Sequence, residues 1–186
     1  MPLLKRVHFP TVKKLDLGFD TQKILECFDS VTYKQDTINA KYAKEWMNKE
    51  YKQRTITKSS TGDEYDEHSY GELLEQYKNT YIEEVINSFK SPVTRVRLIV
   101  KKPSAYILPH IDYDTTYSMR YYIPLQTSEW ALTFVKAKDG EVETHNIKAD
   151  GSAYFVNPGY MHAAINLGKT DDIRLILSVN GQEDMK

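Results

Sequence analysis

Two histidines and one aspartate in the second half of the chain have side chains that can bind a divalent transition metal. His110 and Asp112 are two residues apart, so an extended segment points both to the same side. His162 comes much later, at the start of another predicted strand. Two imidazoles and one carboxylate form the ligand set typical of non-haem Fe(II), with other coordination positions left open. We therefore predict that His110, Asp112 and His162 bind iron, with neighbouring Asp114 as the competing carboxylate.

Arg174 is placed to bind the far end of a molecule chelated at this metal. If the turn between the last two predicted strands centres on residues 169–170, Arg174 pairs with about Ile165, three residues from His162. Three strand rises of ~3.3 Å then separate the two positions by about 10 Å. Because a guanidinium binds a carboxylate bidentately and stays charged, a five-carbon dicarboxylate fits between metal and arginine. Ser178, on the same face, is expected to add a hydroxyl.

Strands are predicted throughout the chain after Pro92. Apolar and polar residues alternate there, and turn signals such as Asp139-Gly140 and Asn157-Pro158-Gly159 separate the segments. The predicted strands cover 94–101, 105–110, 118–124, 131–136, 141–147, 152–156, 161–166 and 173–180. Eight short strands without an intervening helix are typical of a jelly roll of the cupin type.

Several of these strands have one apolar face and one polar face that carries arginine. Either the polar face is simply solvated, or it lines a cavity, as one face of every strand does in a small barrel. Given a jelly roll, we favour the cavity, which would accept an anion. The residues predicted to contact substrate or co-substrate are Arg95, Arg97, Tyr106, Arg120, Tyr122 and Asn166.

The first half of the chain has a helical pattern. Asp20 could cap a short helix, and further helices are predicted at 39–51 and from Ser69 to Phe89. The polar segment 52–68 is predicted to be a lid-like loop. We expect these helices to pack on one sheet of the β core.

Length and composition limit the possible classes. A chain of 186 residues suits one domain, in which 1–91 is the helical part with its lid-like loop, 92–181 the β core and 182–186 a tail. The formal charge of -1 gives no indication of nucleic-acid binding, and no apolar run is long enough to span a bilayer. The single cysteine, Cys27, excludes a disulfide framework and fits a reducing compartment, so we expect a cytoplasmic protein. The pattern does not predict the oligomeric state.

Two segments of the β half of the chain resemble a known family. The segments HIDYDTTYSMRYYIPL (110–125) and PGYMHAAINLGKTDDIRLILSV (158–179) are similar to Fe(II)/2-oxoglutarate-dependent oxygenases of the aspartyl/asparaginyl β-hydroxylase-like group, which includes free-proline hydroxylases. The resemblance covers about residues 94–180. It implies a double-stranded β-helix core, iron on His110, Asp112 and His162, and the distal carboxylate of 2-oxoglutarate on Arg174.

The implied reaction uses O2 and 2-oxoglutarate to hydroxylate a small or peptidyl substrate, an amino acid or an amino-acid residue, with release of succinate and CO2. The group often has Arg-x-His-x-Pro-Leu where this chain reads Arg120-Tyr121-Tyr122-Ile123-Pro124-Leu125. The resemblance implies that Arg120 contacts a carboxylate, while Tyr122 replaces the histidine. Some members lack the carboxylate ligand, so the presence of Asp112 is closer to the proline-hydroxylase pattern.

Two other functions fit the same residues. The first is a cupin enzyme that binds a divalent metal through His110, Asp112 and His162 without using 2-oxoglutarate. It predicts that Arg174 is dispensable. The second is a non-catalytic jelly-roll binding module, which predicts that neither iron nor 2-oxoglutarate raises the melting temperature.

Overall fold

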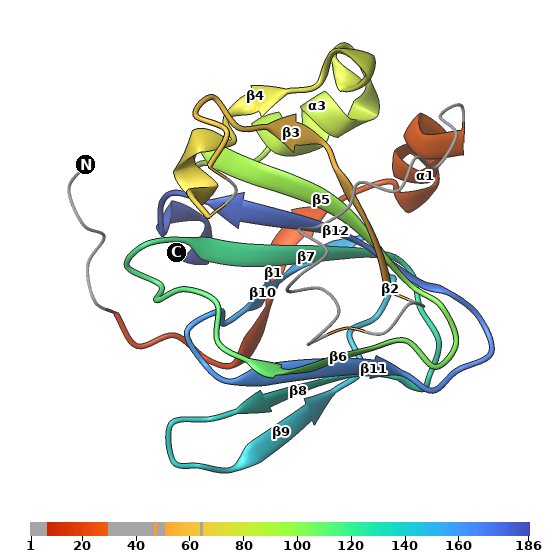
Figure 1. The fold of residues 1–186 in the computed structure, drawn as a ribbon, viewed down its shortest axis with the longest axis vertical. Coiled ribbons are helices and arrows are strands. Elements are labelled where there is room, and N and C mark those ends of the chain that lie inside the picture. Colours follow the sequence, from red (N-terminus) through yellow and green to blue (C-terminus); the bar gives the residue numbers. More distant parts are fainter. Residues whose placement is uncertain (1–6, 30–46, 48–50, 64) are drawn as a thin grey trace.

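Two antiparallel β-sheets face one another, and short helices and a small sheet of two strands, β3 (Thr57–Lys58) and β4 (Glu72–Leu73), lie outside the larger one (Figure 1). The computed structural model describes residues 7–29, 47, 51–63 and 65–186. The larger sheet has the strand order β1 (Val12–Gly18), β10 (Ser152–Val156), β7 (Met119–Gln126), β12 (Asp172–Val179), β5 (Val93–Lys101) and β2 (Tyr51–Thr55). The smaller sheet has the order β6 (Tyr106–His110), β11 (His162–Asn166), β8 (Ala131–Lys136) and β9 (Val142–His145). The second half of the chain crosses repeatedly between the two sheets, which is the topology of a jelly roll, or double-stranded β-helix.

All eight strands predicted after Pro92 are present. They are β5 (Val93–Lys101), β6 (Tyr106–His110), β7 (Met119–Gln126), β8 (Ala131–Lys136), β9 (Val142–His145), β10 (Ser152–Val156), β11 (His162–Asn166) and β12 (Asp172–Val179). The mainly β, cupin-like fold class is thus confirmed. These strands are found correctly because their period-two alternation reflects burial on one face of each strand.

Where the structure describes it, the first half of the chain is less helical than its pattern predicts. The elements described there are β1 (Val12–Gly18), α1 (Thr21–Asp29), β2 (Tyr51–Thr55), β3 (Thr57–Lys58), η1 (Glu67–Ser69), β4 (Glu72–Leu73), η2 (Glu75–Tyr77) and α3 (Tyr81–Asn87), and η3 (Glu183–Met185) follows the last strand. The cap predicted for the first helix is correct, because Asp20 Oδ1 accepts hydrogen bonds from the backbone N–H groups of Gln22 and Lys23. The helix predicted at 39–51 lies outside the described residues, apart from Met47 and Tyr51.

The helix predicted from Ser69 to Phe89 is wrong over its first half. Asn79 has φ 58°, in the left-handed region, which interrupts a right-handed helix at that residue. The helix therefore begins only at α3, where Thr80 is the N-cap and accepts a hydrogen bond from the Ile82 N–H. Ser69, where the predicted helix starts, donates its hydroxyl to the carbonyl of Asp66.

The segment 52–68, predicted to be a lid-like loop, starts as part of the larger sheet. β2 pairs antiparallel with β5, and this register places Tyr51 opposite Lys101 and Thr55 opposite Arg97. The strand lies at the edge of the sheet and has no clear apolar alternation, so its backbone hydrogen bonds to β5, which sequence does not reveal, decide its conformation.

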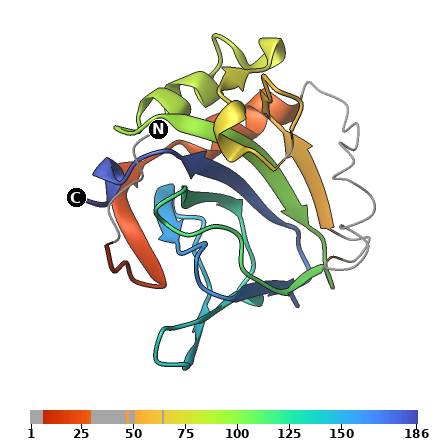
Figure 2. The ribbon, with the colours of Figure 1, turned by 60° about the vertical axis from the view of Figure 1, so that its left-hand side comes forward.

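The main hydrophobic core lies between the larger sheet and the helices on its outer side (Figure 2). Ile24 and Phe28 from α1, and Ile82 and Val85 from α3, are buried there. They pack in one cluster with the outward-facing apolar residues of the central strands, namely Val96, Leu98, Tyr121, Ile123, Leu175 and Leu177. Helices do pack on one sheet, as expected, and its other face is left for the interior of the β core. Among the described residues, no helix combines the length and the apolar character needed to cross a membrane.

Candidate functional site

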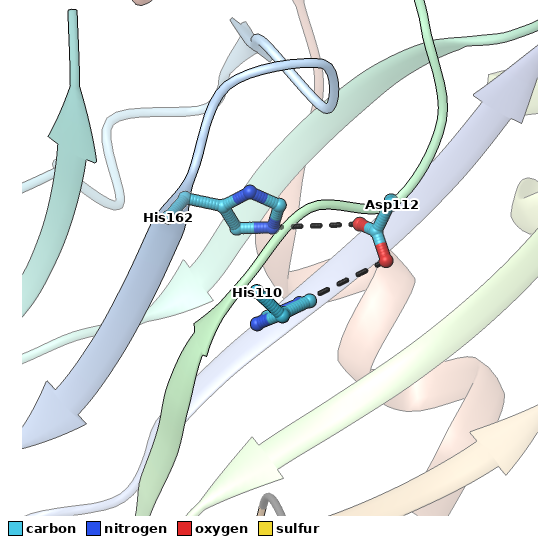
Figure 3. Close-up of side chains that lie close together, drawn as sticks. All are labelled: His110, Asp112 and His162. Carbon is cyan, nitrogen blue, oxygen red and sulfur yellow. Dashed lines mark ion pairs between the residues drawn. The ribbon is translucent and has the colours of Figure 1, made fainter.

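His110 and His162 are direct neighbours across a strand pair. β6 and β11 run antiparallel, and their register sets His162 opposite His110. The two rings lie 4.3 Å apart between centroids. Asp112 follows β6 in a loop that its backbone N–H anchors to the carbonyl of Pro158. Figure 3 shows the three side chains pointing toward one another from β6, β11 and the loop.

The ligand atoms of this group are arranged as a metal site requires. One atom from each of the three residues lies within 4.8 Å of the others. Asp112 Oδ2 is 3.4 Å from His162 Nε2, and Asp112 Oδ1 is 3.8 Å from His110 Nε2 (Figure 3). Competing Asp114 is not in this group, and its Oδ1 accepts the Thr116 N–H instead.

Hydrogen bonds to the backbone orient both imidazoles. His110 Nδ1 lies 2.7 Å from the carbonyl oxygen of Leu108, and His162 Nδ1 lies 2.9 Å from that of Tyr160. A carbonyl can only accept, so each Nδ1 carries a hydrogen, and each Nε2 is the ring nitrogen that faces Asp112 and would bind a metal. Metal-binding histidines typically have their other ring nitrogen fixed in this way. The donor set therefore fits a divalent transition metal.

The electrostatics keep this group ready to bind a cation. Burial alone would raise the pKa of Asp112, but the Arg120 guanidinium, to which it is hydrogen-bonded, and His162 hold it well below its usual range. Burial and neighbouring His162 lower the pKa of His110. Asp112 is thus ionised and His110 favours its neutral form, which are the protonation states that metal binding needs.

The three residues line a cavity of about 230 Å³ between the two sheets. Its wall on the larger sheet consists of inward-facing side chains of β2, β5, β7 and β12, and its wall on the smaller sheet comes from β6, β8 and β11. The charged and polar lining residues beyond the histidine–aspartate group are Tyr51, Gln53, Tyr65, Glu67, Arg95, Arg97, Lys101, Tyr113, Arg120, Tyr122, Thr133 and Arg174. The parity that predicts Arg95, Arg97, Arg120, Tyr122 and Arg174 on the inner face is therefore correct.

Arg174 lies in the cavity wall, and hydrogen bonds to the described residues use only part of its guanidinium. The side chain is 1 % exposed. Its Nε donates to Asp172 Oδ1 at 3.0 Å, and its Nη1 donates to Thr133 Oγ1 at 3.1 Å. Its Nη2 is buried and has no hydrogen-bond partner among the described residues. A buried donor of this kind is costly unless a ligand accepts from it, so the group fits the carboxylate of a bound molecule.

The strand pairing that led to Arg174 is wrong, although Arg174 faces the same cavity as His162. β12 lies in the larger sheet, where Arg174 is opposite Ile99 on β5 and Pro124 on β7. β11 lies in the smaller sheet, so Ile165 is not its partner. The segment 167–171 carries the chain from one sheet to the other, and the two residues approach across the space between the sheets.

Lys101 and Asp172 form a buried ion pair beside Arg174. Lys101 Nζ lies 2.6 Å from Asp172 Oδ2, and both side chains are at most 4 % exposed. Burial and the Arg174 guanidinium lower the pKa of Lys101 to about 8, against the opposing effect of Asp172. Burial alone would raise the pKa of Asp172, but the two cations lower it. The Asp172 carboxylate is thus the shared counter-charge of Lys101 and Arg174 at this end of the cavity.

A second cluster of arginines surrounds Glu67. Arg95 Nη1 donates to Glu67 Oε1 at 2.8 Å, and Arg120 Nη2 is 3.9 Å from Glu67 Oε2. Burial opposes ionisation, but Arg97, Arg120 and Arg95 together with the Ser178 hydroxyl lower the pKa of Glu67 to about 2. Glu67 is 1 % exposed and stays ionised.

Three residues predicted for the site have other contacts. Ser178 is four residues from Arg174 on β12, or ~13 Å along the strand, and donates its hydroxyl to Glu67 Oε2 at 2.5 Å. Asn166 faces inward beyond the cavity, where its amide nitrogen donates to the carbonyls of Lys101 and Thr170. Tyr106 is 39 % exposed and does not line the cavity. Counting alternate residues identifies a face, but not how far along that face a cavity extends.

Several lining residues have no signal that identifies them before the fold is known. Glu67 belongs to the segment predicted as a lid-like loop, and Tyr51 and Gln53 belong to an edge strand that was not expected. Thr133 lies on a correctly predicted strand, but only its contact with Arg174 distinguishes it. Lys101 lies an even number of residues after Arg95 and Arg97, so the same alternation along the strand predicts that it faces inward.

Comparisons with known proteins show the family and the fold of this chain. Residues 21–183 match the family model of aspartyl/asparaginyl β-hydroxylases. Among solved structures, an oxidoreductase of the 2OG-Fe(II) oxygenase family from Burkholderia pseudomallei is similar, with a TM-score of 0.53 and 12% sequence identity over 70% of this chain and 68% of that one. This similarity shows a common fold.

Solved structures of cupins are similar to this chain with lower TM-scores. A predicted oxalate decarboxylase from Thermotoga maritima has a TM-score of 0.41 at 16% identity, covering 72% of this chain and 83% of that one. The cupin domain of Cnp3 from Schizosaccharomyces pombe has a TM-score of 0.43 at 13% identity, covering 72% and 66%. No curated protein matches the sequence. Because the family model spans most of the chain, this protein belongs to the aspartyl/asparaginyl β-hydroxylase family.

Proposed function

We propose that this chain is an Fe(II)- and 2-oxoglutarate-dependent dioxygenase that hydroxylates a small or peptidyl substrate, an amino acid or an amino-acid residue, and releases succinate and CO2. The observation that carries the proposal is the convergence of His110, Asp112 and His162 in the same cavity as Arg174, whose Nη2 has no partner in the described part of the chain. Membership of the hydroxylase family supports it.

The register of the smaller sheet supports a ligand of the right length. Arg174 Nη1 is bonded to Thr133, and Thr133 is paired with Ala164. Ala164 is two residues from His162 on β11, so the level of the guanidinium is ~7 Å along the strand from the level of His162. A five-carbon dicarboxylate with one end at the His110–Asp112–His162 group has its other carboxylate near Arg174.

The residues of the chain would divide the work as follows. His110, Asp112 and His162 would hold Fe(II), which when bound supplies the redox chemistry that couples oxidation of 2-oxoglutarate to hydroxylation. Arg174 would bind and orient the distal carboxylate, with Asp172 and Thr133 fixing the plane of its guanidinium. The enclosing sheets would keep bulk water from the reacting groups, which strengthens each charged contact.

The test of 2-oxoglutarate use is succinate release with Fe(II), ascorbate and a panel of amino acids and peptides. Arg174→Gln removes the charged hydrogen bond from Nη2 to the co-substrate, at about 1.5–3 kcal/mol, so KM for 2-oxoglutarate should rise by roughly tenfold to 150-fold. Lys169→Gln, which changes an exposed cation just before β12, is the control and should leave KM unchanged. A 2-oxoglutarate-independent cupin enzyme predicts no succinate and turnover unaffected by Arg174→Gln.

The metal site is tested separately by binding. Mn(II), an octahedral stand-in for Fe(II), should raise the melting temperature of the wild-type protein by linkage. Asp112→Asn should abolish this rise, while Asp114→Asn, whose side chain lies outside the cluster, should retain it. A non-catalytic jelly-roll module predicts no rise with Mn(II) or with 2-oxoglutarate in any of these proteins.

A further inference from the structure

Arg97 is a cation of the cavity wall that the described residues leave without an ion-pair partner. It faces the cavity from β5, between Arg95 and Ile99 on the same strand. Arg95 is paired with Glu67, and Arg120 is paired with Asp112 and lies near Glu67. In the described part of the chain no carboxylate lies within ion-pair distance of Arg97, and its buried Nε has no hydrogen-bond partner.

The charge balance around Arg97 favours an additional anion. Three guanidinium groups, those of Arg95, Arg97 and Arg120, share two carboxylates, Glu67 and Asp112. Asp112 also belongs to the candidate metal group, so a bound divalent cation increases the positive excess. Burial above all, and then Arg120 and Arg95, lower the pKa of Arg97, and the attraction of Glu67 offsets this only in part. An uncompensated buried charge is costly, and proteins ordinarily pair it.

The position of Arg97 separates it from the site proposed for the co-substrate. On the inner face of the larger sheet, Arg97 lies opposite Ile176, whereas Arg174 lies opposite Ile99. The two arginines are therefore on neighbouring strands and one inward-facing position, or ~7 Å, apart along the sheet. Arg97 is also on the side of β2, where Gln53 lines the cavity with its amide group.

We propose that Arg97 binds a compact oxyanion of the substrate, a carboxylate or a phosphate, and thereby makes the enzyme selective for anionic substrates. The proposal rests on the proposed function, because it places the substrate in the cavity beside the co-substrate. Glu67 accepts hydrogen bonds from Arg95, Tyr113 and Ser178 and attracts Arg97 only from beyond ion-pair distance, which leaves the N–H groups of Arg97 to the ligand. The cavity of about 230 Å³ is smaller than the ~300–1,000 Å³ of pockets for drug-sized ligands. The group that enters is accordingly small.

Two properties of variants test the role of Arg97 without knowledge of the substrate. In the absence of ligands, Arg97→Met removes an unpaired charge, so its melting temperature should equal or exceed that of the wild type. Arg95→Met leaves Glu67 with one fewer partner and should melt at a lower temperature. An Arg97→Met protein that melts as low as Arg95→Met would contradict the assignment of Arg97 as a cation without an ion-pair partner.

Anion binding is then measured with acetate and with inorganic phosphate as probes. The protein is first saturated with Mn(II) and N-oxalylglycine, an inert analogue of 2-oxoglutarate, and sodium chloride of equal ionic strength is the reference. With a Kd of about 5 mM, 50 mM probe should raise the wild-type melting temperature by roughly 3–6 °C. Arg97→Met should show a shift below about 1 °C. The larger response identifies the substrate group as a carboxylate or as a phosphate.

Three results would overturn the proposal. In the first, neither probe raises the melting temperature of the wild type more than chloride does. In the second, the probes raise the melting temperature of Arg97→Met as much as that of the wild type. In the third, N-oxalylglycine no longer raises the melting temperature of Arg97→Met, which would assign Arg97 to the co-substrate. A wild-type protein without any response to Mn(II) and N-oxalylglycine contradicts the proposed function instead. The two probes are therefore also titrated into the metal-free wild-type and Arg97→Met proteins, so that the two failures stay distinguishable.

Discussion

Asp172→Asn should both destabilise the protein and make it depend on a bound anion. Asp172 is fully buried and is the shared counter-charge of Lys101, at 2.6 Å, and of Arg174, at 3.0 Å. Asparagine has nearly the same shape, so the substitution leaves no cavity. It removes the negative charge and leaves two buried cations beside one another.

The expected size of the effect follows from the burial of all three groups. Breaking a buried ion pair by removing one partner costs about 3–5 kcal/mol. For a chain of this size, 1 kcal/mol corresponds to about 2–4 °C, so the melting temperature should fall by roughly 6–20 °C. Because the folded-state pKa of Asp172 is below its unfolded value, this contribution is complete above about pH 4 and is lost as the pH falls further. The difference between variant and wild type should therefore narrow in acid.

Differential scanning calorimetry with and without Mn(II) and N-oxalylglycine measures both consequences. A dicarboxylate bound at Arg174 replaces part of the missing charge, so the ligands should raise the melting temperature of Asp172→Asn more than that of the wild type. Asp171→Asn, a neighbouring carboxylate without an ion pair among the described residues, is the matched control and should behave like the wild type. A loss of less than 2 °C, or equal ligand shifts in both proteins, would refute the view that Asp172 compensates Arg174.

Three further predictions concern single residues. Burial lowers the pKa of Lys101 to about 8, whereas in the unfolded chain the same amine keeps its proton up to about pH 10.5. The free energy of unfolding of the wild type, measured in urea, should therefore rise by about 2 kcal/mol relative to that of Lys101→Met between pH 8 and 9.5. A difference in stability between the two proteins that stays constant over this pH range would contradict the prediction. Gly151→Ala should lower the stability by at least about 1 kcal/mol more than Gly140→Ala does. Both glycines have positive φ, but only at Gly151 would an added Cβ lie 2.7 Å from the carbonyl oxygen of Phe19. Equal losses of melting temperature in the two variants would exclude that clash. Thr80→Ala removes the N-cap of α3 and should lower the stability by about 1 kcal/mol in the same urea assay, with Thr80→Ser retaining it.

The sequence by itself was sufficient for the β core and for the faces of its strands. Alternation with period two is a local property, and it identifies all eight strands from Val93 to Val179 as well as the inward direction of Arg95, Arg97, Arg120 and Arg174. The types of His110, Asp112 and His162 were likewise sufficient to propose a metal site, because few side chains bind iron. The family resemblance pointed to the same residues.

The tertiary structure alone decided which of these residues meet and what compensates them. His162 faces His110 because β6 and β11 pair in one register, and Arg174 joins them from the opposite sheet rather than from a neighbouring strand. Ser178 has the correct parity, but it is bonded to Glu67, which comes from a segment with no periodic pattern. Periodicity is set within a few residues, whereas register and the partners of buried charges depend on backbone hydrogen bonds and packing between distant segments, so a pattern along the chain does not contain them.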